Sequence, residues 1–199
     1  MAKNKVFDEI WGWFDAGKQY ASKGAELFGG QRQMLAGRYY GTDGGFPSTN
    51  AHALNQLWVS PLWVPHRITI DRITVEVTAG VATATPRLGL YAAAPDGQPG
   101  TLILDAGTVD GSTTGVKEIT PAGTLTIPAG LYFVGAVNQV AAATLRTIGS
   151  SPAAPVHATV GGGSTGANSY FVNSVSGALP TTATWSVSSG APRVMVRIA

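Results

Sequence analysis

The chain of 199 residues contains no cysteine and little charge. Because there is no thiol, a disulfide framework, a zinc–thiolate site and a cysteine nucleophile are all excluded, and packing alone must hold the fold. Charged residues make up only 12% of the chain, and the formal net charge is +2. Beyond residue 40, seven basic side chains balance seven acidic ones. Nucleic-acid binding requires a concentrated basic surface, so we expect no nucleic-acid partner.

Long apolar runs are also missing. No segment reaches the roughly 18 consecutive apolar residues that a transmembrane helix needs. Near the N-terminus, Asp8, Glu9 and Asp15 interrupt the apolar residues where a signal peptide has an unbroken apolar stretch. We therefore expect neither a signal peptide nor membrane insertion, and a protein that is made and kept without export.

The charge that is present divides the chain into two parts. Ten of the 24 charged side chains fall within the first 40 residues. That segment has the periodicity of a helix, whereas the later residues form short segments of period two. We predict an N-terminal helical arm with its connector (residues 1–57) and a β-sandwich domain (residues 58–199).

Apolar or small residues recur in the arm at spacings that alternate between four and three, which is typical of an amphipathic helix with a near-heptad repeat. The residues of this stripe are Val6, Ile10, Trp13, Gly17, Tyr20, Gly24 and Leu27. Each glycine inside a helix costs about 1 kcal/mol relative to alanine, so the helix is marginal without a partner. We predict that the large members of the stripe (Val6, Ile10, Trp13, Tyr20 and Leu27) mediate oligomerisation or docking.

Two other interpretations of the arm stay open. The helix can pack on the domain of its own chain. Alternatively, an interfacial membrane anchor can form from Lys3, Lys5, Trp11, Trp13 and Phe14, although the neighbouring carboxylates weaken the basic face that such an anchor needs.

After the connector, apolar and polar residues alternate in short segments. In residues 66–78 the alternation slips by one residue at Asp71 and Arg72, as at a β-bulge, and residues 96–100 (DGQPG) form a strong turn signal. Further strands are predicted at residues 87–93, 101–109, 116–120, 124–127, 131–140, 143–148, 169–175, 184–188 and 193–198. About ten strands without an intervening helix predict a mainly β fold, an antiparallel, jelly-roll-like β-sandwich preceded by the amphipathic helix and an extended arm.

Residue types that carry catalysis do not gather in a recognisable motif. His52, His66 and His157 are far apart and are interpreted as surface or turn residues, which predicts no metal site and no cofactor. The carboxylates available for a catalytic pair are Asp71, Glu76, Asp96, Asp105, Asp110 and Glu118. Turn capping explains several of them, and no GxSxG motif exists. We predict that the protein is not an enzyme.

Candidate contact residues lie in two places. Residues 150–166 form a Pro/Gly/Ser-rich segment that is predicted to be a long loop, and such loops are usually functional or mobile. The aromatic residues on predicted strands that could stack on a glycan are Tyr91, Tyr132, Tyr170, Phe171 and Trp185. At least half of these should be core residues. The candidate surface or glycan contacts are Tyr170, Trp185 and, in the loop, His157.

Four sequence pieces in residues 60–145 occur together: IDRITVEVT, RLGLY followed by DGQPG, LDAGTVDGSTTG, and LTIPAGLYF. In texture and strand order this region resembles the β-sandwich of many minor tail, tail-fibre and head-fibre proteins of tailed bacteriophages. The resemblance implies a virion structural protein with a jelly-roll-like body, commonly a trimer, that contacts other proteins of the tail, baseplate or capsid. It assigns no binding residue.

We therefore expect a structural protein on the surface of a bacteriophage particle, as a tail fibre, minor tail protein, head fibre or capsid decoration. It would be attached through the arm and would display the sandwich for host attachment or particle stabilisation. The alternative is a carbohydrate-binding module without catalysis, and both can hold for one protein. An enzyme such as a depolymerase is a third hypothesis, and it lacks a convincing acid/base pair.

Overall fold

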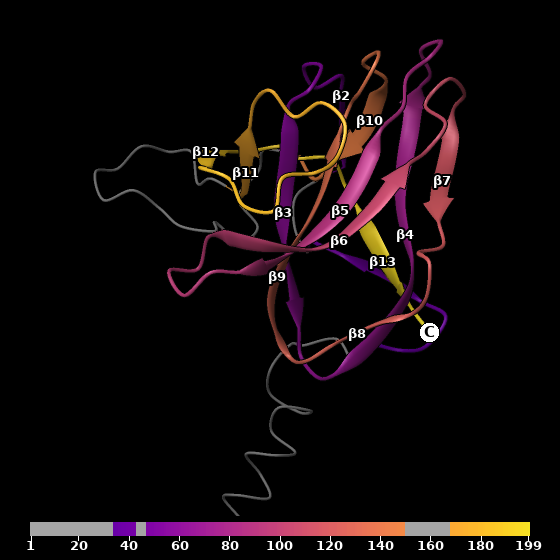
Figure 1. Cartoon of the computed structure of the whole chain (residues 1–199). Coiled ribbons are helices and arrows are strands. Elements are labelled where there is room, and N and C mark those ends of the chain that lie inside the picture. The colour runs from indigo at the N-terminus through magenta and orange to yellow at the C-terminus, as the bar shows by residue number, and fades with distance from the viewer. Residues whose placement is uncertain (1–33, 43–46, 150–167) are drawn as a thin grey trace, which may run out of the picture. The chain divides into compact units, whose positions relative to one another are not determined.

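The computed structural model of the chain describes residues 34–42, 47–149 and 168–199. Residues 35–199 form one compact unit, which is mainly β (Figure 1). Its described residues contain thirteen strands in two antiparallel sheets and no helix. No helix of the described ranges is long and apolar enough to cross a membrane. The predicted helix of the arm lies outside the described residues.

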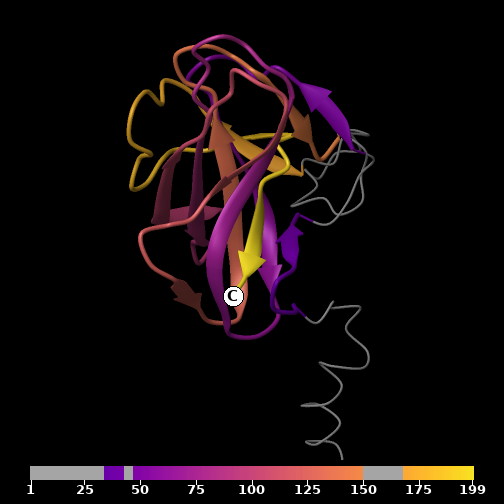
Figure 2. The same cartoon turned by 90° about the vertical axis from the view of Figure 1, so that its right-hand side faces the viewer.

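The seven-stranded sheet is organised around one long strand, β4, and five of its strands follow the order β1 (Tyr39–Gly41), β13 (Met195–Ile198), β4 (Ile68–Ala79), β10 (Thr144–Thr147) and β2 (Ser48–Asn50). Along its other edge β4 pairs with β7 (Gly115–Ile119) and with β8 (Leu125–Ile127). Figure 2 shows β13 running beside β4. A twelve-residue strand can take several short partners because each pairs with a different part of it.

The six-stranded sheet has the order β12 (Ser186–Ser188), β11 (Ser169–Val172), β3 (Leu57–Val64), β9 (Gly130–Val137), β5 (Arg87–Ala93) and β6 (Pro99–Thr108). The two sheets contact each other where β4 lies near β5 and where β1 lies near β3. β12 and β6 are the two edges of this sheet.

The predicted β-bulge in β4 is confirmed. Arg197 lies opposite Arg72, but the next residue, Ile198, lies opposite Ile70, so Asp71 is the extra residue of β4. The extra residue shifts the alternation by one position. As a result Ile70 and Ile73 are both fully buried although they are three residues apart.

The middle strands of the six-stranded sheet are buried on both faces. In β3, Leu57 and Val59 point to one face and Leu62 and Val64 to the other, because successive side chains of a strand alternate, and all four are buried. The first face carries a core of its own, which we call the second core. Its buried members are Leu57, Val59, Tyr91, Phe133, Val137, Tyr170, Val175 and Leu179. All of these come from the six-stranded sheet or from residues 173–185.

Residues 173–185, which we call the covering segment, connect β11 to β12 and cover this face. In Figure 1 the segment is the orange loop that passes in front of β3. The Val175 amide donates to the carbonyl oxygen of Asn55 at 2.8 Å, and the Leu102 amide donates to that of Thr181 at 2.8 Å. The segment is therefore fixed at both sides of the sheet.

The predicted domain boundary differs from the structure. The sequence predicts that the arm with its connector extends to residue 57, yet β1 pairs with β13 and β2 pairs with β10. The compact unit accordingly begins at Leu35. These two strands have only three residues each, too few for a period-two pattern, and they are held by partners distant in the sequence. The predicted loop at residues 150–166 lies outside the described residues.

Candidate functional site

Five of the six carboxylate side chains among the described residues pair with a basic side chain. The pairs are Asp71–Arg197, Glu76–Arg146, Asp105–Arg87, Asp110–Lys117 and Glu118–Arg72. The sixth carboxylate, Asp96, caps the turn between β5 and β6, where its Oδ1 accepts a hydrogen bond from the Gln98 amide at 3.0 Å. Each carboxylate considered for a catalytic pair thus has a structural contact.

Three of the pairs join neighbouring strands of the seven-stranded sheet, and in two of these three the arginine contacts both carboxylate oxygens. Arg146 of β10 donates from Nε and Nη2 to the two carboxylate oxygens of Glu76 in β4, at 3.0 and 2.9 Å. Arg197 of β13 makes the same two-point contact with Asp71. These hydrogen bonds hold the pKa of Glu76 and of Asp71 below the usual range. A general acid at neutral pH needs a raised carboxyl pKa, so the two groups are suited to fixing strands.

Asp105 fixes the covering segment to the edge strand β6. Its carboxylate accepts hydrogen bonds from Arg87 Nε and Nη2 at 2.7 and 2.9 Å. It also accepts bonds from the amides of Leu179, at 3.0 Å, and Gly107, at 3.2 Å. Burial raises the pKa of this carboxyl, but the Arg87 and amide donors outweigh burial and hold the pKa below its usual range.

The two described histidines lie in different surroundings. His52, interpreted from the sequence as a surface or turn residue, is buried, because its ring packs on Trp58 with centroids 4.6 Å apart and Trp58 in turn stacks on Phe171 at 5.0 Å. Burial lowers the pKa of His52 to about 4. His66 is exposed, and His157 lies outside the described residues. Among the residues that the structure describes, no three His, Cys, Asp or Glu side chains are placed to hold a metal ion.

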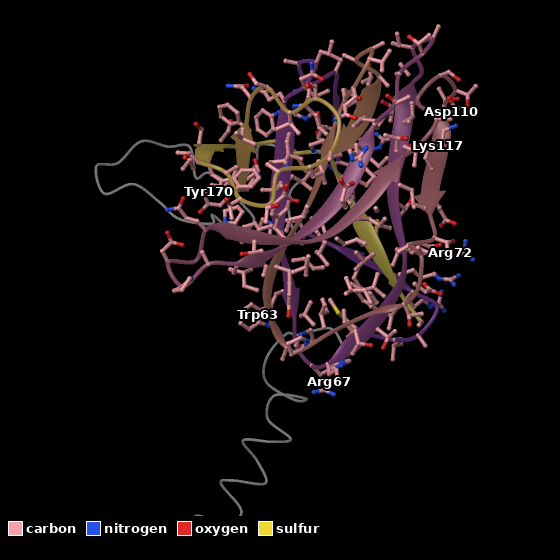
Figure 3. All side chains as sticks on the ribbon, viewed as in Figure 1. Trp63, Arg67, Arg72, Asp110, Lys117 and Tyr170 are labelled. Atoms are coloured by element: carbon pink, nitrogen blue, oxygen red, sulfur yellow. The ribbon has the colours of Figure 1, made fainter. Side chains whose placement is uncertain are left out.

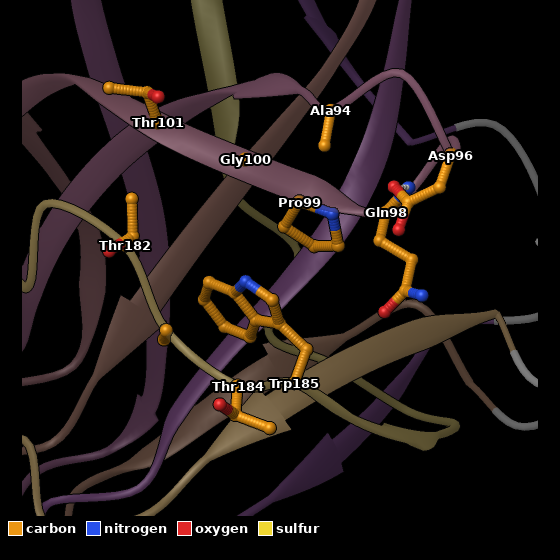
Figure 4. A pocket seen from close by; sticks show the side chains of 10 residues that line it. Ala94, Asp96, Gln98, Pro99, Gly100, Thr101, Thr182, Thr184 and Trp185 are labelled. Atoms are coloured by element: carbon orange, nitrogen blue, oxygen red, sulfur yellow. Dashed lines mark hydrogen bonds between the residues drawn. The ribbon is translucent and has the colours of Figure 1, made fainter.

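A cleft of about 410 Å³ lies between the β5–β6 hairpin and the end of the covering segment (Figure 4). The residues that line it are Ala94, Asp96, Gln98, Pro99, Gly100, Thr101, Thr182, Ala183, Thr184 and Trp185. Figure 4 shows the indole of Trp185 between Pro99 and Thr182. We call this feature the Trp185 cleft.

The hairpin side of the cleft is set by the predicted turn at residues 96–100, which is confirmed. The Ala94 amide donates to the carbonyl oxygen of Gln98 at 2.8 Å, and Gly97 has a φ of 81°, which glycine adopts without strain. Gly100 must also be glycine, because a Cβ there would lie 2.9 Å from the Ala94 amide nitrogen. The tight hairpin leaves Pro99 facing the indole.

The Trp185 side of the cleft is anchored in the second core. The indole contacts Tyr91 edge-to-face, with centroids 5.4 Å apart and an interplanar angle of 85°. The Tyr91 hydroxyl donates to the carbonyl oxygen of Pro180 at 3.0 Å, which holds the approach to Trp185 in place. The indole Nε1 is buried and has no hydrogen-bond partner within the described ranges, so Trp185 offers the cleft its carbon face.

The predicted contact residues lie in different parts of the chain: one lines the cleft, one is in the core, and the others are outside the described residues. Trp185 is half-buried and lines the cleft. Tyr170, expected at the surface, is only 1% exposed and packs edge-to-face on Phe133 in the second core; Figure 3 shows its place on β11. His157 and the stripe residues Val6, Ile10, Trp13, Tyr20 and Leu27 lie outside the described residues. The prediction that at least half of the five aromatics are core is confirmed, since Tyr91, Tyr132 and Tyr170 are buried.

Sequence reasoning missed the threonines of the cleft. Thr101, Thr182 and Thr184 are exposed around the indole. Only Thr101 follows a recognisable turn, and the other two lie in a segment without periodicity.

No protein family, curated protein or solved structure matches the chain.

Proposed function

We propose that this chain is a non-catalytic structural protein on the surface of a bacteriophage particle, attached through its N-terminal arm and displaying a jelly-roll-like β-sandwich. The observation that carries the proposal is the tightly fixed β unit, in which the middle strands of the six-stranded sheet are buried on both faces. Five ion pairs and one turn cap engage all its described carboxylates. Such a unit is suited to display on the surface of a particle rather than to catalysis.

The sequence adds the attachment mode to this proposal. The compact unit begins at Leu35, so the residues before it can serve as an anchor without contributing strands to the described sheets. The similarity to tail-fibre and head-fibre sandwiches supports the virion location, and the near-heptad stripe supports a homo-oligomer, with a trimer as the favoured state.

The test compares the full chain with residues 35–199 in purified particles. We expect the full chain to copurify with particles at a copy number that fits a symmetric tail or capsid site, and the shorter chain to fold but stay in the supernatant. Quantitative mass spectrometry of gradient-purified particles measures both. Absence of the full chain from the particles would sink the proposal, and equal incorporation of the shorter chain would remove the arm as the anchor.

A second candidate function, carbohydrate binding without catalysis, is favoured by the Trp185 cleft. An aromatic face bordered by hydroxyl and amide side chains is suited to a sugar ring. This function is compatible with the first, because a displayed virion domain can attach to a host glycan. A glycan array with the full chain tests it directly.

A further inference from the structure

We infer that the Trp185 cleft binds a short, uncharged stretch of oligosaccharide, with Trp185 as the stacking platform. The inference rests on the carbohydrate-binding candidate above and names its site and its ligand class. A cleft of about 410 Å³ lies within the range of small-molecule sites, about 300–1,000 Å³.

The indole supplies the apolar half of the recognition. The ring lies between Pro99 and Thr182 in the view of Figure 4, and its position is fixed by the edge-to-face contact with Tyr91. A rigid aromatic ring loses little side-chain freedom when a ligand binds, so the contact area is gained at low entropic cost. Because Nε1 is buried, the accessible atoms of the indole are ring carbons. Such carbons can contact the C–H groups on one face of a pyranose.

The polar half comes from side chains that the described fold does not use. Within the described ranges, no hydrogen bond involves the side chains of Gln98, Thr101, Thr182 or Thr184. Several other threonines use their hydroxyls in structural hydrogen bonds, among them Thr42, Thr69, Thr74, Thr78 and Thr85. The cleft therefore combines unengaged hydroxyls and an amide, which can donate to and accept from sugar hydroxyls.

Charge selects among sugars. No basic side chain lines the cleft, and its one ionisable group is Asp96. Anionic ligands such as uronic acids or sialic acids would meet a carboxylate and no counter-charge, which disfavours them. An uncharged oligosaccharide meets no such penalty, and Asp96 retains a second oxygen that can accept from a sugar hydroxyl.

The experiment measures binding of the full chain by calorimetry and saturation-transfer NMR. The probes are neutral gluco-, galacto-, manno- and N-acetylglucosamine oligosaccharides and oligosaccharides that carry uronic or sialic acid. We expect a neutral ligand to bind, and expect Trp185→Ala to weaken it at least about ten-fold, which corresponds to about 1.4 kcal/mol. Trp63→Ala is the matched control, since Trp63 is 55% exposed and lies at the other end of β3 from Tyr170 (Figure 3).

A second pair of variants avoids the core. Thr182→Ala with Thr184→Ala should also weaken binding without changing the midpoint of thermal unfolding, because both residues are exposed. Thr114→Ala is the corresponding control, since Thr114 is an exposed threonine outside the cleft and its hydroxyl makes no hydrogen bond within the described ranges. A flat response to all neutral probes, binding confined to anionic probes, or equal loss in the control variants would each overturn the inference. None of these results would affect the copurification of the chain with particles.

Discussion

At the scale of single residues, His52 is the group whose protonation the fold changes most among the described histidines. Its ring is 4% exposed, packs on Trp58, and has a buried Nε2 without a hydrogen-bond partner in the described part of the chain. Burial lowers its pKa from 6.5 to about 4, and a hydrogen bond with the backbone of Gly190 opposes that effect only in part. Between pH 6.5 and about 4, His52 is therefore protonated in the unfolded chain and neutral in the folded chain.

This difference predicts an acid-sensitive stability. Between pH 6.5 and about 4 the unfolded state binds more protons. The contribution of His52 to the free energy of unfolding is therefore fully present above this window and is lost as pH falls through it. The pKa difference corresponds to at most about 3 kcal/mol. His52→Gln should flatten the dependence, as measured by urea unfolding between about pH 7 and pH 5. The exposed His66→Gln is the matched control, and an unchanged slope in His52→Gln would refute the assignment.

At the scale of elements, the covering segment is held by one close approach. Gly89 in β5 faces Leu179, and a Cβ at Gly89 would lie 2.2 Å from Leu179 Cδ1 and 2.9 Å from the carbonyl oxygen of Leu104. The glycine thus leaves the space that Leu179 fills. Leu179 itself is 5% exposed, and the Asp105 carboxylate accepts its amide.

We therefore predict that Gly89→Ala destabilises the fold by about 1–3 kcal/mol through overpacking. Leu179→Ala should cost about 2–5 kcal/mol. In the double variant the new methyl group occupies the space that the leucine leaves, so the combined cost should be smaller than the sum of the two single costs. Urea unfolding of the four proteins gives the coupling energy. If the two changes in the free energy of unfolding simply add, Leu179 is not packed tightly against Gly89.

The elements also show where prediction from sequence succeeds. The strand at residues 66–78 and its slip at Asp71 were predictable, because several apolar residues on one long strand report the phase directly. The hairpin at residues 96–100 was predictable from turn chemistry that acts locally. Both signals are contained within a dozen residues of sequence.

Other features depend on contacts that no local pattern encodes. Tyr170 was predicted to be a surface residue. The alternation of apolar and polar residues along a strand identifies the two faces of a sheet, but it does not show whether other segments cover both faces. In β11, the covering segment buries the side that a two-layer arrangement would leave in solvent. The Trp185 cleft depends in the same way on a bond from Leu102 to Thr181, between residues about 80 positions apart.

At the scale of the whole molecule, the compact body begins at Leu35 rather than at residue 58. The segment that can act as an arm is therefore shorter than predicted. Removing residues 1–57 would also remove β1 and β2, and would leave the outer edges of β13 and β10 without these partners. Exposed edges promote aggregation. Residues 35–199 are therefore the proper body for experiments that separate folding from attachment.

The last prediction concerns the stripe of the arm. A near-heptad stripe with glycines along it favours close helix association, and Val6 and Ile10 are β-branched residues of the kind found at such a seam. Burying one large apolar side chain of this kind contributes about 1.5–3 kcal/mol per subunit, so equivalent copies reinforce one another. Ile10→Asp combined with Trp13→Asp should release monomers or prevent docking while the far-UV circular dichroism of the β body stays unchanged.

Mass photometry of the full chain measures this outcome, and Gln19→Asp with Ser22→Asp is the matched control, since both residues lie off the stripe. The control adds the same two charges to the same predicted helix, so a loss of oligomers in both variants would reflect charge rather than the seam. If the stripe variant keeps its oligomers, the arm is not the subunit contact. The body would then have to supply the contact, and the edge strand β12 is the surface to test next.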